Sequence, residues 1–486
     1  MKRFTKTVLT VLAVMVLAFA LVLAGCSGES ASVKNILKTS SNADGDVYTI
    51  YYSDGTSSTI TISNGSDVTA KDLYEYYKEI YNDDLTYDEF LKKYLAEPTD
   101  NASVIGSCLQ SAVKIYTEFV ETKTSSAGGI FGGVTTTTQT AVYTGSGVVY
   151  QMQDDYTYII TNYHVVYDVN ASAANGGHMA RKIVCYLYGS EGSPALAGTG
   201  SDGYAIYNYG SYAIECEYVG GSISNDIAII RAETEDIQAK NPNVTTAAFA
   251  NEYHVGETAI AIGNPEGEGI SVTEGIVSVD NEYINLQIDN AVRSYRSLRI
   301  DTAIYGGSSG GGLFNLKGEL IGITNAGNST DQNINYAIPL EIAKGTADNI
   351  LHYYFGNGDN LGYGIKLGVQ VVSQNSKYVY DIASGYGTIR EEIVVDSVNS
   401  GSIADSMGLE MNDKLQTFKI RTKGGETREV TLDRNFDISD VILTIRAGDT
   451  ISFGIVRGGE STTSAEYTVK ESDLVELDTL YTSNKA

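Results

Sequence analysis

The sequence predicts a mostly β protein that is divided into several domains. Its 486 residues include 51 Gly and 36 Tyr but only 5 Pro; tyrosine favours strands, whereas glycine favours turns. From residue 102 to about residue 349, short apolar runs alternate with turns that contain Gly and Asn, a pattern typical of a β-barrel. At about 100–200 residues per domain, the length accommodates two to four domains.

The net charge of −27 excludes some classes of partner. With 33 Lys+Arg against 60 Asp+Glu, phosphates would repel the chain, so we expect no nucleic-acid binding and no electrostatic attraction to anionic lipid. Only four His and four Cys are present, without a CxxC pair, and no P-loop motif occurs. We therefore predict neither a metal site nor a cofactor.

The N-terminus, residues 1–25, has the pattern of an export signal. Positive residues precede an apolar run that is short for a membrane span and typical of a signal-peptide core. The run ends in Leu23-Ala24-Gly25-Cys26, which resembles the lipobox of bacterial lipoproteins. That resemblance implies a lipid on Cys26 and a location at the cell membrane, facing its extracytoplasmic side. The alternative is a plain secretory signal with a Cys beside its cleavage site.

Two short regions are predicted to follow the signal. Residues 26–45 are small and polar, which suits a flexible tether, and residues 46–97 form a small α+β module. Within this module, alternating runs flank Asp54-Gly55, a strong hairpin signal. Capping boxes that begin at Thr69 and Thr86 then predict two helices, so we interpret the module as a spacer or an interaction unit.

Three cysteines remain beyond the signal. Cys185 and Cys216 lie in runs typical of strands that pair with each other, so either a disulfide or two buried thiols would fit the sequence. Cys108 is most simply a core residue.

Three short segments carry the residue types that an activated serine requires. His164 follows an apolar run, Asp226 immediately precedes another, and Ser309 lies in the glycine-rich segment Gly306–Gly312. A serine hydroxyl is a poor nucleophile until a neutral His accepts its proton, and that His needs a carboxylate to fix its tautomer. Glycines let backbone N–H groups converge on a developing oxyanion. Each segment is weak evidence alone, but the chemistry needs all three.

In the order His, Asp, Ser, these segments resemble the chymotrypsin-fold serine proteases, and within them the HtrA (DegP-like) family. The resemblance extends from about Ser107 to Ile342 and implies a chymotrypsin-like double β-barrel, which we assign to residues 102–349. The matching segments, in chain order, are TNYHVV, NDIAII, AIAIGNPEG, VTEGIVS, DTAIYGGSSGGGLFN, GELIGIT and NYAIP.

The resemblance implies a role for each matching residue. His164 would be the general base, Asp226 the carboxylate that orients it, and Ser309 the nucleophile. The N–H groups of Gly307 and Ser309 would form the oxyanion hole. Ser308 is adjacent, but only Ser309 fits the central Ser of Gly-x-Ser-Gly-Gly. Ser308 replaces the Asn that is usual in the family, a change that removes no proton-transfer group.

The residues predicted to line the substrate pocket carry no charge. Ala303, six residues before Ser309, lies where the chymotrypsin fold has its pocket floor, so we expect apolar P1 residues such as Val, Ala or Leu. The predicted strand that contains Thr324, Asn325 and Ala326 would line the cleft and pair with an extended peptide backbone. Such pairing suits unfolded or misfolded polypeptides.

Residues 363–472 resemble a PDZ domain of the kind appended to HtrA proteases; a β-sandwich is the alternative fold. A short helix is expected at Ser402–Met407, between strand-like runs. The resemblance implies that C-terminal peptides bind at the backbone of Lys366, Leu367, Gly368 and Val369. Residues 350–362 are predicted to be a linker and residues 473–486 a polar tail.

Together these features predict an exported, membrane-anchored serine endopeptidase that cleaves unfolded or misfolded proteins without ATP. Its C-terminal module would bind substrate or regulate activity, and the family resemblance also implies a homotrimer. The alternative, from another class, is a catalytically inert surface scaffold that uses the same domains for protein interaction. Covalent labelling of Ser309 would discriminate between them.

Overall fold

The computed structural model describes most of the chain beyond residue 100 and parts of the N-terminal module. The described residues are 33–42, 45–52, 57–63, 74, 78, 86, 101–126, 134–171, 177–201, 203–327, 333–381 and 385–480. The chain divides into two compact units, residues 1–99 with 380–386, and residues 100–379 with 387–486. Each unit is described by itself.

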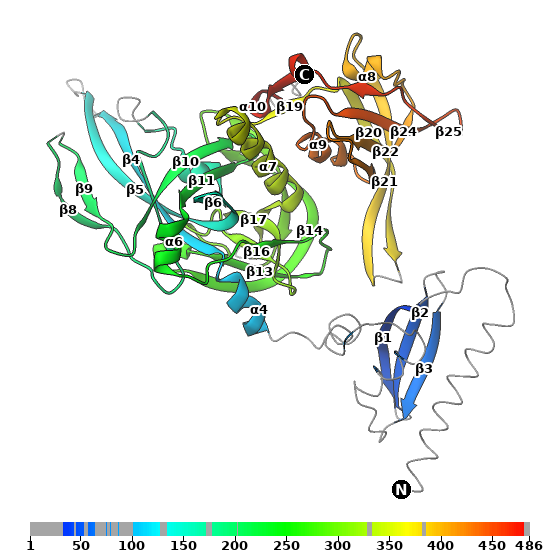
Figure 1. Cartoon of the computed structure of the whole chain (residues 1–486), viewed down its shortest axis with the longest axis horizontal. Helices are drawn as coiled ribbons and strands as arrows, with labels where there is room; N and C mark the ends of the chain where they lie inside the picture. The colour runs from blue at the N-terminus through cyan, green and yellow to red at the C-terminus, as the bar shows by residue number, and fades with distance from the viewer. Residues whose placement is uncertain are drawn as a thin grey trace, which may run out of the picture. The chain divides into compact units, whose positions relative to one another are not determined.

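The N-terminal unit contains a three-stranded antiparallel sheet, drawn in blue in Figure 1. The predicted hairpin is confirmed, because β2 (Gly45–Tyr52) pairs with β3 (Ser57–Ser63). The tether predicted over residues 26–45 is wrong in part, since β1 (Val33–Asn42) pairs with β2. The prediction gave weight to small polar residues and overlooked the apolar positions in VKNIL. Cys26 and nearly all of the two predicted helices lie outside the described residues.

Six antiparallel strands close into a first barrel, in the order β10-β11-β6-β5-β4-β7. Apolar side chains from alternate strand positions fill its interior, among them Ile115, Ile159 and Ile230. Its strands are β4 (Ala112–Ser126), β5 (Val134–Gln153), β6 (Tyr156–Thr161), β7 (Lys182–Leu187), β10 (Ile214–Ser222) and β11 (Ile227–Glu233).

Shorter elements surround the first barrel. Helix α4 precedes it, α5 and α6 follow β6 and β11, and β8 pairs with β9 in a separate two-stranded sheet. Their bounds are α4 (Asn101–Cys108), α5 (Tyr163–Val166), α6 (Thr234–Lys240), β8 (Ala195–Thr199) and β9 (Ala205–Asn208).

A second sheet of seven strands follows in the order β12-β17-β16-β13-β14-β15-β18. Because β17 also pairs with β18, six of these strands form a closed ring. The double-barrel prediction is thereby confirmed. The strands are β12 (Ala248–Phe249), β13 (Thr258–Gly263), β14 (Ser271–Gln287), β15 (Val292–Ile300), β16 (Gly312–Phe314), β17 (Glu319–Gly327) and β18 (Asn335–Pro339).

A long helix, α7 (Leu340–Asn357), continues from the last strand of the ring and packs beside β10 and β11 (Figure 1). The linker predicted over residues 350–362 is therefore wrong for most of its length. Ala347, Ile350 and Leu351 continue a buried apolar stripe, which the prediction missed because it gave weight to the later Gly and Asn residues. The helix ends at Gly358, whose φ of 76° is the left-handed conformation typical of a C-cap.

The C-terminal domain is a β-sheet with two short helices. Phe418 and Phe453 stack at its centre, with ring centroids 4.3 Å apart. The predicted short helix is confirmed as α8 (Ile403–Ser406), whose N-cap Ser402 accepts a hydrogen bond from Asp405 N. The other elements are β20 (Val369–Asp381), β21 (Tyr386–Val398), β22 (Lys414–Arg421), β23 (Thr427–Thr431), α9 (Asp437–Ile442), β24 (Thr450–Arg457), β25 (Glu460–Thr463) and β26 (Tyr467–Thr468).

The polar tail predicted from residue 473 contains two ordered elements instead. Strand β27 (Leu474–Glu476) pairs with β19 (Tyr363–Ile365), and α10 (Leu477–Leu480) follows it. Leu477 is buried, with 1% of its surface exposed. The apolar residues Leu474, Val475, Leu477 and Leu480 alternate with acidic and polar residues over a short stretch, so composition alone did not predict this docking.

Two further expectations concern thiols and membranes. Strands β7 and β10 pair as expected, with Cys185 opposite Ile214 and Cys216 opposite Ile183. Cys108, Cys185 and Cys216 are all free thiols.

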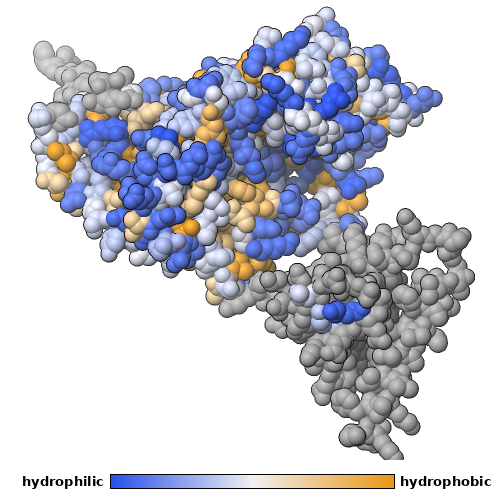
Figure 2. Space-filling view, viewed as in Figure 1, coloured by the Kyte–Doolittle hydropathy of each residue, from blue (hydrophilic) through white to orange (hydrophobic). Residues whose placement is uncertain are grey.

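Among the described helices, none has both the length and the apolar character needed to cross a membrane. On the face in Figure 2, hydrophilic residues predominate and hydrophobic residues form small separate groups.

Candidate active site

His164 lies on α5, which begins two residues after the end of the buried strand β6. The two residues that follow it, Val165 and Val166, are buried in the barrel core and anchor the helix. The imidazole is 31% exposed, so it faces the surface from a fixed backbone. The strand-then-His pattern seen in the sequence corresponds to this arrangement.

Asp226 ends the turn between β10 and β11 and is fully buried. One of its carboxylate oxygens accepts from the backbone N–H of His164 at 3.0 Å, and the other lies 2.8 Å from His164 Nδ1. A carboxylate can only accept, so Nδ1 carries the proton and Nε2 is left as the acceptor. This is the tautomer that a general base needs.

The charge of Asp226 also affects the acidity of His164. Burial of the imidazole disfavours its charged form, but the negative charge of Asp226 and the hydrogen bond to it outweigh burial. The pKa of His164 is therefore raised above its usual value of 6.5.

The Ser309 loop packs against the end of β6, where α5 begins. Ser309 O accepts from Ser146 N at 2.8 Å, and Gly310 N donates to Thr324 O at 2.8 Å. Gly310 has a φ of 86°, and a Cβ atom there would lie 2.2 Å from Ser146 O and 2.3 Å from Thr161 Oγ1. Only glycine allows this approach, which brings Ser309 to the barrel end that carries His164.

The Ser309 hydroxyl donates to Asn325 O at 2.8 Å. Within the described chain, no hydrogen bond joins it to His164. The structure thus brings His164 and Asp226 into contact, whereas the Ser309 hydroxyl is hydrogen-bonded to the carbonyl of Asn325. Rotation of the Ser309 side chain about χ1 by about 120°, to another staggered rotamer, would turn Oγ away from Asn325 O. Catalytic hydrogen bonds often form only when substrate is bound.

The predicted oxyanion-hole amides have no acceptor among the described residues. Neither Gly307 N nor Ser309 N takes part in a backbone hydrogen bond there. The preceding carbonyl, Gly306 O, accepts from Glu266 N at 2.5 Å. Because a trans peptide places its C=O and N–H on opposite sides, this bond turns Gly307 N–H away from Glu266. Both amides are left available for a ligand oxygen.

Two residues that support this loop, Ser146 and Asn264, were not singled out from the sequence, and Thr324 was predicted only as a pocket residue. Ser146 Oγ donates to Gly307 O and accepts from Asn264 N, both at 2.8 Å, so it links the first barrel to the loop. Thr324 Oγ1 donates to Ser308 O at 2.6 Å. Asn264 and Thr324 lie in segments that match the HtrA pattern, but the hydroxyl and amide contacts of all three residues depend on the folded geometry.

An uncharged cavity of about 180 Å³ opens beside the loop. It brings together two predicted pocket residues, Ala303 and Thr324, with Ile262, Ile304 and Ser308. The other two predicted pocket residues, Asn325 and Ala326, continue β17 but do not line this cavity. No residue that lines this cavity carries a charge.

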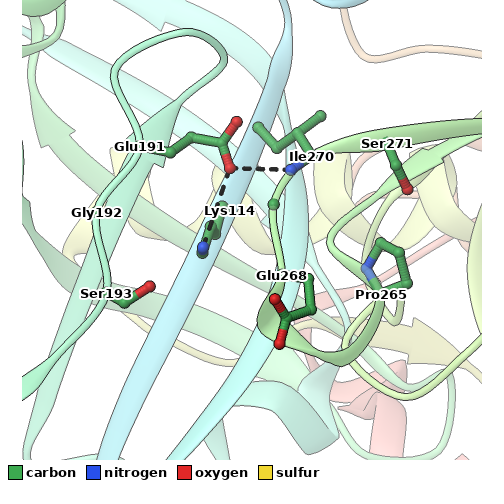
Figure 3. A pocket seen from close by; sticks show the side chains of 9 residues that line it. Lys114, Glu191, Gly192, Ser193, Pro265, Glu268, Ile270 and Ser271 are labelled. Atoms are coloured by element: carbon green, nitrogen blue, oxygen red, sulfur yellow. Dashed lines mark hydrogen bonds and ion pairs between the residues drawn. The ribbon is translucent and has the colours of Figure 1, made fainter.

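A second hollow, of about 540 Å³, is lined by the loop that follows β13 (Figure 3). Lys114 Nζ donates to Gly267 O at 2.9 Å, and Glu191 accepts from Ile270 N at 2.9 Å. These two charged side chains lie 3.9 Å apart and hold the loop that contains Glu266. They support the oxyanion loop indirectly, through the Glu266–Gly306 hydrogen bond.

The predicted peptide-binding residues of the C-terminal domain, 366–369, lead into β20, which begins at Val369. Lys366 is exposed and Leu367 is buried. Leu367 O and Gly368 O accept from the backbone N–H groups of Ala404 and Asn399, and Gly368 has a φ of 72°. This turn is therefore fixed against the start of α8.

Comparison with known proteins identifies the barrels. A sequence model for the family described as "Trypsin-like peptidase domain" matches residues 145–323. The serine protease Do-like HtrA of Lactococcus lactis subsp. lactis is 24% identical over 405 residues, which covers 79% of this chain and 86% of the relative. The protein of the same name in Bacillus subtilis is 27% identical over 324 residues, covering 66% of this chain and 62% of the relative. Residues 145–323 thus match a trypsin-like peptidase domain, and the chain is similar to Do-like HtrA serine proteases.

The family match includes His164, Asp226 and Ser309 within one segment of the chain. A solved structure, "HtrA-type protease AlgW with decapeptide", is 22% identical, covers 76% of this chain and 99% of that chain, and has a TM-score of 0.43. Among the described residues, no group of three or more His, Cys, Asp or Glu is arranged to hold a metal ion.

Proposed function

We propose that this HtrA-type chain is an active endopeptidase that cleaves unfolded polypeptides through an acyl-enzyme. The observation that carries the proposal is the two-point contact between Asp226 and His164 beside the Ser309 loop. Asp226 fixes the tautomer in which His164 Nε2 can accept a proton. Ser309 Oγ, once turned away from Asn325 O, gives its proton to Nε2 and attacks the substrate carbonyl.

The remaining steps use groups already described. The N–H groups of Gly307 and Ser309 stabilise the oxyanion that forms on attack. His164 then passes the proton to the leaving amine, the peptide bond breaks, and water hydrolyses the acyl-enzyme with His164 again acting as base. The uncharged cavity that contains Ala303 and Thr324 supports cleavage after Val, Ala or Leu.

Covalent labelling with a fluorophosphonate tests this function and the assignment of the nucleophile. We expect wild type and Ser308→Ala to be labelled and to cleave unfolded casein, and Ser309→Ala to do neither. Labelling that survives Ser309→Ala and is lost in Ser308→Ala would contradict the assignment. A folded wild type that is labelled under no condition would favour the inert-scaffold alternative.

We also propose that the C-terminal domain is a PDZ domain that binds C-terminal peptides at residues 366–369. The fixed turn before β20 supports this proposal, because its amides would keep one orientation toward a carboxylate. Fluorescence anisotropy with a labelled peptide ending in an apolar residue tests it. Amidation of the peptide C-terminus should abolish binding; unchanged binding would refute carboxylate recognition.

Membrane anchoring and assembly complete the proposed function. The lipobox-like segment before Cys26 supports a lipid anchor that holds the protease at the extracytoplasmic face of the cell membrane. Incorporation of an alkyne fatty acid should be lost in Cys26→Ser, and retention of the label would refute the anchor site.

We further propose a homotrimer, which light scattering of the signal-free chain would test.

A further inference from the structure

The turn that presents Asp226 is held by hydrogen bonds from several distant elements. Tyr295 Oη, on β15, donates to Ile223 O at 2.8 Å, and Asn225 Nδ2 donates to Thr346 Oγ1, on α7, at 2.8 Å. Asp226 O accepts from Asn162 Nδ2 at 3.0 Å. Both barrels and the long helix thus contribute to the position of this turn.

The C-terminal segment contributes a further contact to the same turn. The Oδ1 atom of Asp478, on α10, accepts from Ser222 Oγ at 2.7 Å and from Ser224 N at 3.0 Å. Ser224 Oγ in turn donates to Asp478 O at 3.4 Å. One carboxylate therefore joins both sides of Ile223, the residue in the middle of the stretch that leads to Asp226. No other acidic side chain is bonded to this turn within the described chain.

This turn needs support because Asp226 has a strained backbone. Its φ of 51° is in the left-handed region, which residues other than glycine adopt only at a cost in free energy. Relaxation of the turn would move the carboxylate away from the two His164 donors. A displacement of about 1 Å is enough to lower the rate of a catalysed step by about 100-fold.

Asp478 is brought to the turn by a defined docking of the segment before it. Strand β27 pairs with β19, and Leu477 N donates to Gly362 O at 2.9 Å. A Cβ atom on Gly362 would lie 2.6 Å from Leu477 Cδ1, so Leu477 fills the space that this glycine leaves. Figure 1 shows α10 and β19 side by side at the junction between α7 and the C-terminal domain.

We propose that Asp478 is a positioning residue for catalysis. By holding Ser222 and Ser224, it keeps Asp226 in contact with His164, and it does so only while the segment Leu474–Leu480 is docked. The activity of the protease domain thus depends on a carboxylate that follows the C-terminal domain in the chain. The inference rests on the proposed function, because it assigns Asp226 its role in the triad.

Steady-state cleavage of a peptide substrate with Val at P1 tests this inference in the full signal-free chain. We expect Asp478→Ala to lower kcat by about 10- to 100-fold with KM nearly unchanged, because the substrate contacts stay in place. Asp478→Asn keeps the oxygen that accepts from Ser222 and Ser224, so it should retain most of the activity. Glu476→Ala, which removes an exposed carboxylate from the same segment, is the matched control.

A second variant separates positioning from loss of fold. If Asp478 acts through Ser222, Asp478→Ala combined with Ser222→Ala should lower kcat no more than Asp478→Ala alone. Thermal unfolding must show that all variants are folded at the assay temperature. Unchanged kcat in a folded Asp478→Ala, or equal losses in Asp478→Asn and Asp478→Ala, would overturn the inference. Inactive wild type would instead refute the proposed protease function.

Discussion

Asp226 holds His164 at two points, with one carboxylate oxygen 3.0 Å from the backbone nitrogen and the other 2.8 Å from Nδ1. The contact to the backbone fixes where the one-turn helix α5 begins, and the contact to Nδ1 fixes the ring. The carboxylate therefore sets both the position and the tautomer of the imidazole, so changes to Asp226 should affect catalysis more than folding.

We expect Asp226→Asn to lower kcat by about 10,000-fold, because an amide can donate to Nδ1 and favour the wrong tautomer. Asn tolerates the left-handed backbone at this position, so the thermal midpoint should remain close to that of wild type. Peptide hydrolysis and circular dichroism measure the two quantities. A comparable loss of activity with a large fall in stability would mean that Asp226 has a structural role instead.

The rate should depend on pH through His164. The general base must be neutral, so kcat/KM should fall as the pH drops below the pKa of His164. Because Asp226 raises that pKa, the midpoint of the acid limb should lie above 6.5. Rates measured between pH 5 and pH 9 on a neutral peptide would show it. A midpoint below 6.5 would contradict the dominance of the Asp226 charge over burial.

Gly310→Ala should abolish fluorophosphonate labelling. The new Cβ atom would lie 2.2 Å from Ser146 O and 2.3 Å from Thr161 Oγ1, so the loop would have to move and carry Ser309 with it. Gly306→Ala, in the same loop, is the control, since a Cβ atom there meets nothing within 4 Å. Equal labelling of the two variants would show that the close approach at Gly310 is not required.

Arg296→Met should lower the free energy of unfolding by about 3–5 kcal/mol, because it leaves the mostly buried carboxylate of Asp440 without its cation. Arg296 is 4% exposed in its side chain and lies 2.9 Å from Glu341 and 2.6 Å from Asp440. Urea unfolding measures the change. Arg296→Lys keeps the charge and should lose less stability; equal losses in both variants would show that the position of the guanidinium Nη2 atom, which donates to both carboxylates, matters more than the charge.

The local parts of the site were predictable from the sequence, whereas the contacts between distant segments were not. A His after an apolar run, an Asp before one and a Ser among glycines are each visible within a few residues. Asp478 reaches the turn before Asp226 from 254 residues away in the chain, and it has no local pattern that sets it apart. The hydrogen bond from Ser309 Oγ to Asn325 O is also invisible in the sequence, because it depends on where Asn325 O lies after the barrel closes.

The same distinction explains the errors in the domain boundaries. Gly and Asn residues at the end of the stretch 350–362 favoured a linker that begins at residue 350. Burial of Ile350 and Leu351 against the barrel instead extends α7 to Asn357. Helix propensity and composition describe single segments, and neither reports which surface a segment will cover. The docked strand β27 was missed for the same reason.

The pairing of β19 with β27 has a practical consequence for engineering the protein. Ile365 and Leu474 are directly opposite each other in the paired strands. The C-terminal domain therefore begins and ends at neighbouring positions, as an insertion between the two strands of a hairpin. A two-residue turn such as Asn-Gly could join these residues and replace the whole domain. Such a minimal protease would keep α10, and it would separate the contribution of the excised domain from that of the segment that follows it.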